Sequence, residues 1–219
     1  PNSKGELEDF WVVEYSNFAS DLQKKYPEIR SYSGMGLSDP KATLSLSISP
    51  HGIQTMILRS DFGSEFIEKE NSDKVTYVAY KGTNRSKGAL ALNCKTDDIA
   101  LNNNLLSKTA KTNANNGVFK TLRLALSCTG EYAQYYGGTT AGALGGMNAT
   151  MSRINAIFNK DLAIKLEIIA NNSAIIYTNS VTDPYADASV GTDTGSTDNW
   201  SLQLQRNLTS VIGNDGYDI

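Results

Sequence analysis

The sequence predicts a mixed fold of α+β / α/β class, with a small antiparallel sheet first and the upper part of a mixed sheet after it. Three observations carry this prediction. Short segments before residue 95 alternate apolar and polar side chains with a period of two, which is typical of half-buried strands. Residues 99–117 are Asn-rich and lose apolar periodicity. After residue 118 a strand, a long amphipathic helix and a second strand follow in order.

The first element is a strand over residues 10–16, and Ser16 is suited to cap a short helix that runs to Lys25 and ends before Pro27. The next strands form a hairpin around the turn Pro50-His51-Gly52. The predicted hairpin and the two strands after it cover residues 43–48, 53–58, 62–68 and 75–80. This part therefore predicts an antiparallel sheet with one helix across it.

The segment 99–117 ends in Asn-Asn-Gly and predicts an exposed linker that proteases can reach. It divides the chain into a first domain over residues 1–98 and a second over 118–219.

The second domain opens with a strand at 118–127, and Gly137-Gly138 turn the chain into a helix capped by Thr139 or Thr140. The apolar residues of this helix keep helical spacing at Leu144, Met147, Met151, Ile154 and Phe158. With a strand at 163–169, and an extension at 174–177, they predict a right-handed strand, helix, strand unit whose helix lays one face on a partly parallel sheet.

The last part of the chain is a polar loop at 182–199, a helix at 200–211 that Gly213 ends, and the start of a strand at 217–219.

Composition excludes several classes of protein. The net charge is -3, with both signs interspersed, so no basic stripe is available for nucleic acid. No apolar run is long enough to span a membrane, and the first residues lack the features of a signal peptide. The protein is therefore either cytosolic or secreted with its signal removed, and the abundance of Asn, Ser, Thr, Gly and Tyr favours the second. His51 is the one histidine, which excludes a zinc site made of several histidines.

The order of these elements resembles the reprolysin-like metzincins, zinc metallopeptidases of a bacterial secreted type. The resemblance lies in LALSCTGEYAQYYGGTTAGALGGMNATM and INAIFNKDLAIKLEIIANN, followed by TDPY and YDI. It implies that 118–219 is the upper, N-terminal part of a metzincin (zincin-like) domain. FWVVEYS, YPEIRSYSG and DPKATLSLSISPHG resemble the pro-region that precedes such domains.

In that family an HExxHxxGxxH helix holds zinc and its glutamate acts as general base. The motif is absent from this sequence. The resemblance therefore implies a zymogen portion, inactive alone, of a zinc endopeptidase that acts on proteins or peptides. Its zinc ligands would lie outside this chain, and a second chain that carries the rest of the catalytic domain is a candidate partner. The alternative is a non-catalytic binding or inhibitory module, such as a cleaved pro-domain complex or an adhesion fragment.

Two cysteines have open roles. By the resemblance, Cys94 is a candidate zinc ligand that keeps a zymogen latent; alternatively it forms a disulfide with Cys128, or it is a plain buried thiol. Cys128 ends an apolar strand and is expected to be buried, either free or paired with a cysteine outside this sequence.

The loop residues Asp183, Asp187, Asp193 and Asp198 carry oxygen ligands that suit calcium, although their spacing does not match an EF-hand and such loops are commonly solvated surface. Other polar residues are given structural roles. Glu131 is expected to be a loop charge and Glu167 a strand edge residue, rather than acid/base catalysts, and His51 is expected to lie exposed in a turn.

Overall fold

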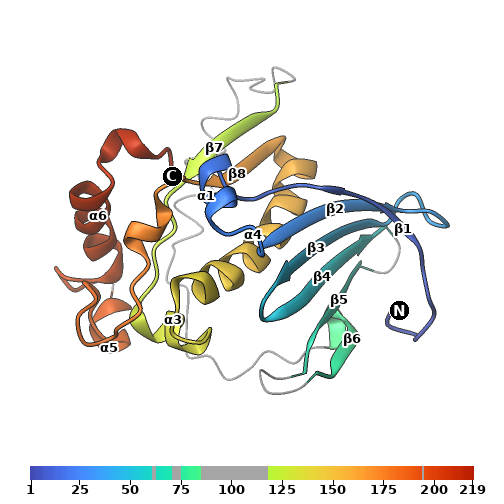
Figure 1. Ribbon diagram of the computed structural model, residues 1–219, viewed down its shortest axis with the longest axis horizontal. Coiled ribbons are helices and arrows are strands. Elements are labelled where there is room, and N and C mark those ends of the chain that lie inside the picture. Colours follow the sequence, from blue (N-terminus) through green and yellow to red (C-terminus); the bar gives the residue numbers. More distant parts are fainter. Residues whose placement is uncertain (61–62, 71–74, 85–117, 194) are drawn as a thin grey trace.

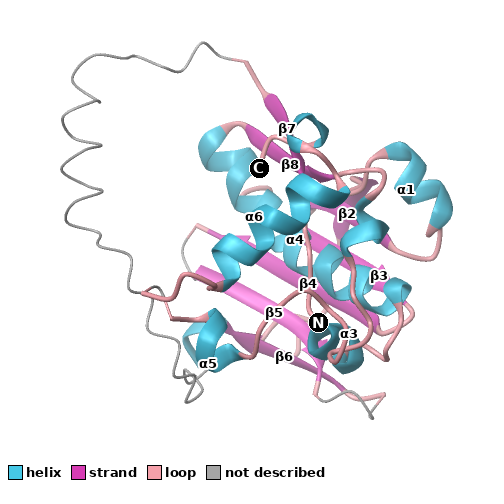
Figure 2. Cartoon of the chain, turned by 90° about the vertical axis from the view of Figure 1, so that its left-hand side faces the viewer, coloured by secondary structure: helices cyan, strands magenta, loops and turns pink. Residues whose placement is uncertain are grey.

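A long helix lies between two sheets in this protein. The computed structural model describes residues 1–60, 63–70, 75–84, 118–193 and 195–219. One sheet has six antiparallel strands and the other is a parallel pair. The helix α4 (Thr140–Leu162) packs on both of them (Figure 1). The helix and the antiparallel sheet behind it are seen in Figure 2.

The six-stranded sheet is a meander in which each strand pairs with the next in sequence. Its strands are β1 (Phe10–Glu14), β2 (Arg30–Gly36), β3 (Thr43–Ser49), β4 (Gly52–Arg59), β5 (Gly63–Lys69) and β6 (Tyr77–Lys81). A short 3-10 helix, η1 (Gly82–Asn84), follows. The antiparallel sheet and all its predicted strands are confirmed. Strand β2 was not predicted separately, because Ser, Tyr and Gly give it little apolar alternation.

The short helix α1 (Ser20–Lys25) begins later than predicted. Its N-cap is Ala19 rather than Ser16. The reason is that the Ala19 N–H donates to the Ile168 carbonyl at 2.8 Å, so the residues before the helix are extended as a strand partner. The Ser16 hydroxyl instead donates to the Gln23 side chain at 2.7 Å.

Helix α4 is capped by the Thr139 side chain, which accepts from the Gly142 N–H. The cap agrees with the prediction, but the prediction of a single buried face was wrong. Every residue from Gly142 to Ala149 is buried, as expected for a helix covered on opposite sides. The helix across the antiparallel sheet is therefore α4, not a helix of the first segment.

Small residues let α4 approach the antiparallel sheet closely. A Cβ placed on Gly145 would lie 3.2 Å from the Ser49 side chain, tighter than ordinary contact. The serines of β2 and β3 that point to this side are themselves small, and Ser31, Ser45 and Ser47 are buried. This helix face and sheet face therefore fit each other without large apolar side chains.

The parallel pair consists of β7 (Lys120–Leu124) and β8 (Ile164–Ile168), with Leu122 opposite Leu166. The predicted strand, helix, parallel strand order is confirmed. On its outer side, each strand of the pair forms further backbone hydrogen bonds, β8 with residues 17–19 and β7 with residues 218–219. Ile168 N–H donates to the Asn17 carbonyl at 2.8 Å, and Asp218 N–H donates to the Arg123 carbonyl at 2.8 Å. Residues near both ends of the chain thus flank the pair.

The remaining helices of the second half pack on α4 or on one another. They are α3 (Gly130–Tyr135), η2 (Asn172–Ile175), α5 (Ala188–Gly191), α6 (Trp200–Val211) and η3 (Asn214–Gly216). Helix α6 was predicted, and Gly213 after it has a φ of 81° as expected for a helix end. Helices α3 and α5 were not predicted, and residues 172–175 form a 3-10 turn rather than a strand. Among the described residues, no helix is long and apolar enough to cross a membrane.

One hydrophobic core joins the two halves of the sequence. Phe18, Leu22 and Ile29 are buried in the same cluster as Leu144 and Met151 of α4. The predicted linker at 99–117 lies outside the described residues, so the division at that point stays a prediction. What the structure adds is that the segments before and after it pack together.

A buried ion-pair group fastens the N-terminal residues to the antiparallel sheet. The guanidinium of Arg59 pairs with Glu65 at 2.8 Å and also with Glu8, while Ser3 donates to Glu65. The Arg59 side chain is 8% exposed. The hydrogen bond from Arg59 lowers the pKa of Glu8. Burial alone would raise the pKa of Glu65, but hydrogen bonds from Ser3 and Arg59 lower it below its ordinary value.

Candidate functional site

The carboxyl end of β7 is the first candidate site, because ligands of α/β sheets bind beyond the carboxyl ends of parallel strands. Cys128 lies there, in a single bridge with Ile176. Cavities of about 380 Å³ and 170 Å³ flank it. The larger one is lined by Leu126, Ser127, Cys128, Thr129, Tyr132, Met147 and Thr150. Its walls are largely apolar, so it could take an apolar group but offers few polar partners.

Hydrogen bonds hold the smaller cavity in shape. Tyr185 donates to the Ser127 hydroxyl at 2.5 Å, and Asn207 donates to Tyr185 at 3.1 Å. Trp200 donates its indole N–H to the Ala186 carbonyl at 2.7 Å. Burial raises the pKa of Tyr185. These groups therefore remain neutral and bind the 179–186 loop to α6.

The Cys128 thiol is buried, as predicted, and forms no disulfide with any residue that the structure describes. Its Sγ lies 4.0 Å from the Tyr177 carbonyl. Burial, with a smaller contribution from the nearby Asp183 charge, raises its pKa to about 11. At neutral pH the group is a protonated thiol, which is a poor nucleophile and a poor metal ligand. Cys94 lies outside the described residues, so its latency role and its disulfide with Cys128 stay predictions.

We predict that Cys128 reacts slowly with iodoacetamide in the native protein. With Cys94→Ser as background, alkylation at pH 7.5 should be about a hundredfold slower than in urea, because the raised pKa leaves little thiolate. Mass spectrometry of the alkylated protein measures both rates. Equal rates in native and unfolded protein would contradict the burial of this thiol. Counting free thiols in unfolded wild-type protein without reductant tests the disulfide separately.

Three of the four loop aspartates have separate local partners. Asp183 accepts from the Gly130 N–H at 2.7 Å, Asp193 accepts from the Gly195 N–H at 2.9 Å, and Asp198 pairs with Arg206. Asp187 precedes α5 without a side-chain capping bond. Across the described ranges, no group of three or more His, Cys, Asp or Glu side chains is placed to hold a metal. The calcium prediction therefore gains no support from the geometry.

His51 lines the largest of these cavities, about 530 Å³, between the β3–β4 turn and α4. It is half-buried rather than exposed, and its ring packs edge-to-face on Tyr136 at 5.8 Å. Arg153 crosses the cavity and donates to Glu68 at 3.0 Å and to Gln54 at 3.1 Å. The described residues around His51 supply no further histidine or cysteine, so this cavity does not fit zinc.

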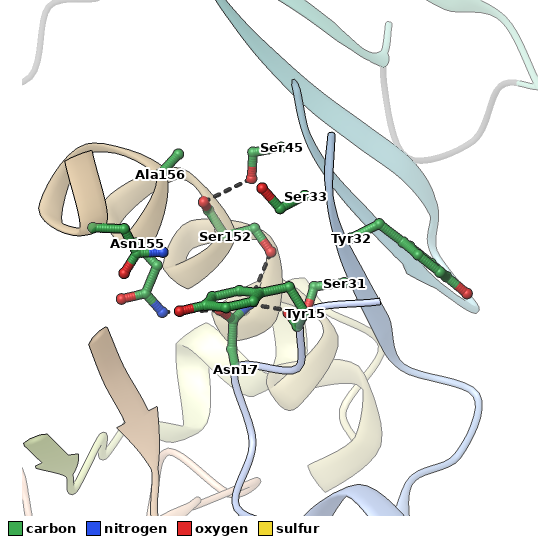
Figure 3. Close-up of a pocket in the computed structure, with 10 residues that line it drawn as sticks. Tyr15, Asn17, Ser31, Tyr32, Ser33, Ser45, Ser152, Asn155 and Ala156 are labelled. Atoms are coloured by element: carbon green, nitrogen blue, oxygen red, sulfur yellow. Dashed lines mark hydrogen bonds between the residues drawn. The ribbon is translucent and has the colours of Figure 1, made fainter. Parts of the chain in front are cut away.

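A polar cavity between α4 and the antiparallel sheet was not predicted (Figure 3). It measures about 20 Å³, room for about one water molecule. Ser31, Ser33 and Ser45 reach it from the sheet and Ser152 from α4, whereas Tyr32 points away. The carbonyl oxygen of the Asn159 side chain is buried, with no hydrogen-bond partner in the part of the chain that the structure describes. It is an acceptor that such a water could use.

Asn17 is the centre of the hydrogen bonds around this cavity. Its amide donates to Asn148 Oδ1 at 2.9 Å and to Ser152 Oγ at 2.8 Å, and its oxygen accepts from Asn155 at 2.9 Å. Asn155 also bonds both backbone groups of Leu166 in β8 at 2.8 Å. The spacing of Asn148, Ser152 and Asn155 on one helix face was the available sequence signal. It was missed because Asn17 lies far away in sequence.

Comparison with known proteins finds a family match for the second half of the chain. Residues 118–219 match the family described as Metallo-peptidase family M12B Reprolysin-like. No curated protein and no solved structure matches. The match covers β7, α4, β8 and the extended residues beside β7, and the mixed α+β fold is consistent with a metallopeptidase domain. It supports a reprolysin-like metallopeptidase, a class that uses zinc and acts on proteins or peptides.

Proposed function

We propose that this chain is the precursor portion of a secreted zinc-dependent endopeptidase. In this proposal residues 1–98 are a pro-domain, 99–117 a linker, and 118–219 the N-terminal portion of the catalytic domain. The observation that carries it is the family match over 118–219, together with a β7–α4–β8 unit that occupies the matched residues. The chain supplies scaffold rather than the groups that do the chemistry.

The zinc ligands would come from residues outside this sequence. The chain has one histidine, and its described residues hold no cluster of metal-binding side chains. What this part contributes is the sheet that would carry the rest of the domain. Tyr217–Ile219 lie extended against β7, and the Ala125 N–H donates to the Ile219 carbonyl at 3.0 Å. Arg123 fixes this segment through its ion pair with Asp218 at 2.7 Å.

The test begins with the gene. If the proposal holds, the reading frame that contains these residues encodes an HExxH motif after Ile219, and the whole protein binds zinc. Purified whole protein should hydrolyse an unfolded protein substrate, and a chelator or replacement of the motif's glutamate by glutamine should abolish this. A reading frame without any HExxH motif would contradict the proposal and favour the non-catalytic binding module. Export from the cells that make it tests secretion separately.

A further inference from the structure

The first segment of the chain supplies a strand to the parallel pair. Phe18 bridges Ile168 in parallel, between two backbone hydrogen bonds. The Ile168 N–H donates to the Asn17 carbonyl, and the Ala19 N–H donates to the Ile168 carbonyl, both at 2.8 Å. Without these residues the outer edge of β8 would have unpaired backbone groups. The N-terminal segment is therefore a part of this sheet and not only its neighbour.

The same segment closes the hydrophobic core under α4. Leu22 and Ile29 are fully buried and Phe18 is 3% exposed, all within the cluster that contains Met151 and Ile168. Their removal would expose the apolar side of α4 and β8 to water. Burial of large apolar side chains is the dominant favourable contribution to folding and association, so three together form a strong contact.

Buried polar groups cross between the two segments as well. Asn17 bonds Asn148, Ser152 and Asn155 of α4. At the same helix residue, Ser45 donates to the Ser152 carbonyl at 2.7 Å. Separation would leave these groups without partners, which costs more than a solvated contact does. The contact thus combines buried apolar side chains with buried hydrogen bonds.

We infer that residues 1–84 are a permanent part of the scaffold that 118–219 form, and that the two segments stay bound after the chain between them is cut. The surface that binds the N-terminal segment is α4 together with the edge of β8 that faces away from β7. The inference rests on these contacts and not on the proposed peptidase function. If the peptidase proposal also holds, a cut in this region would not release the N-terminal segment from the scaffold.

The test uses the whole 219-residue chain with the recognition sequence of a site-specific protease inserted between residues 84 and 118. After complete cleavage, size-exclusion chromatography with light scattering should show one species with the mass of both fragments. Hydrogen exchange should leave the Ile168 and Ala19 amides as protected as before the cut. Separate elution in native buffer, or loss of protection at Ile168, would overturn the inference. Neither readout depends on peptidase activity, so failure here leaves the peptidase proposal standing.

A variant tests the contact itself. Phe18→Ala should weaken binding between the cut fragments by about a hundredfold, as expected for truncating a buried aromatic residue. Leu37→Ala is the matched control, since Leu37 is 63% exposed, and it should leave binding unchanged. Thermal unfolding of the uncut Phe18→Ala chain establishes that it folds. Equal dissociation constants for Phe18→Ala and the unsubstituted cut protein would overturn the inference. If uncut Phe18→Ala does not fold, exchange at Ile168 in the unsubstituted cut protein decides.

Discussion

Replacing Asn155 with alanine is expected to lower the free energy of unfolding by about 3–5 kcal/mol. The side chain is 1% exposed and bonds the Leu166 N–H, the Leu166 carbonyl and the Asn17 oxygen. Alanine leaves all three without a protein partner, and the adjoining cavity has room for only about one water molecule. The loss therefore includes the desolvation of the groups left behind as well as three hydrogen bonds.

Urea unfolding followed by circular dichroism measures this effect. Asn171→Ala is the control, because Asn171 is exposed and makes no side-chain capping bond, and it should change the free energy by less than about 0.5 kcal/mol. A loss below about 1 kcal/mol for Asn155→Ala would show that the network is not formed as described. Faster exchange of the Leu166 amide should accompany the loss.

Replacing Arg59 with methionine is expected to cost about 3–5 kcal/mol at pH 7, since it leaves a buried carboxylate without its cation. Glu65 is 7% exposed at its side chain and lies 2.8 Å from the guanidinium. Arg206→Met is the matched control. Arg206 pairs with Asp198 where both side chains are more than half exposed, so its loss should cost less than about 1 kcal/mol.

The cost of Arg59→Met should depend on pH in a stated direction. The pKa values of Glu8 and Glu65 lie below their ordinary value of 4.5 in the folded protein. Their contribution to stability is therefore complete above about pH 4.5 and is lost as the pH falls through the lowered values. The difference between wild-type and variant should shrink over that range. A difference that stays constant from pH 7 to pH 3 would contradict the ionic origin of the effect.

The elements that could be predicted are those whose pattern is local. Alternation in residues 43–48 and 53–58 defined the central hairpin, and the Thr139 cap with apolar spacing defined α4. The second buried face of α4 could not be predicted from such patterns. It is made of Gly, Ala, Ser and Asn residues, which carry little apolar signal, and its partner is the serine side of β2 and β3. Only the packed structure shows that small residues on both surfaces complement each other.

The candidate site also has one feature that the sequence predicted and others that only the structure shows. Burial of Cys128 followed from its position after an apolar strand, but its raised pKa depends on the residues that enclose it. Asn17 shows most clearly which contacts cannot be predicted from local sequence patterns. In sequence it is one polar residue after a strand, and its partners Asn148 and Asn155 lie 131 and 138 positions later. No local pattern connects them.

The placement of Asn17–Ala19 beside β8 has a consequence for the order of folding. The six-stranded meander pairs only neighbouring strands, so it can form soon after its residues leave the ribosome. The parallel pair cannot form until β8 has been made, which is much later. The backbone pairing along the other side of β7 forms later still, because it includes Ile219. During synthesis, the backbone groups of Asn17 and Ala19 that pair with Ile168 therefore stay unpaired until β8 has been made. This is a stage at which an emerging chain is open to wrong strand pairing and to chaperones.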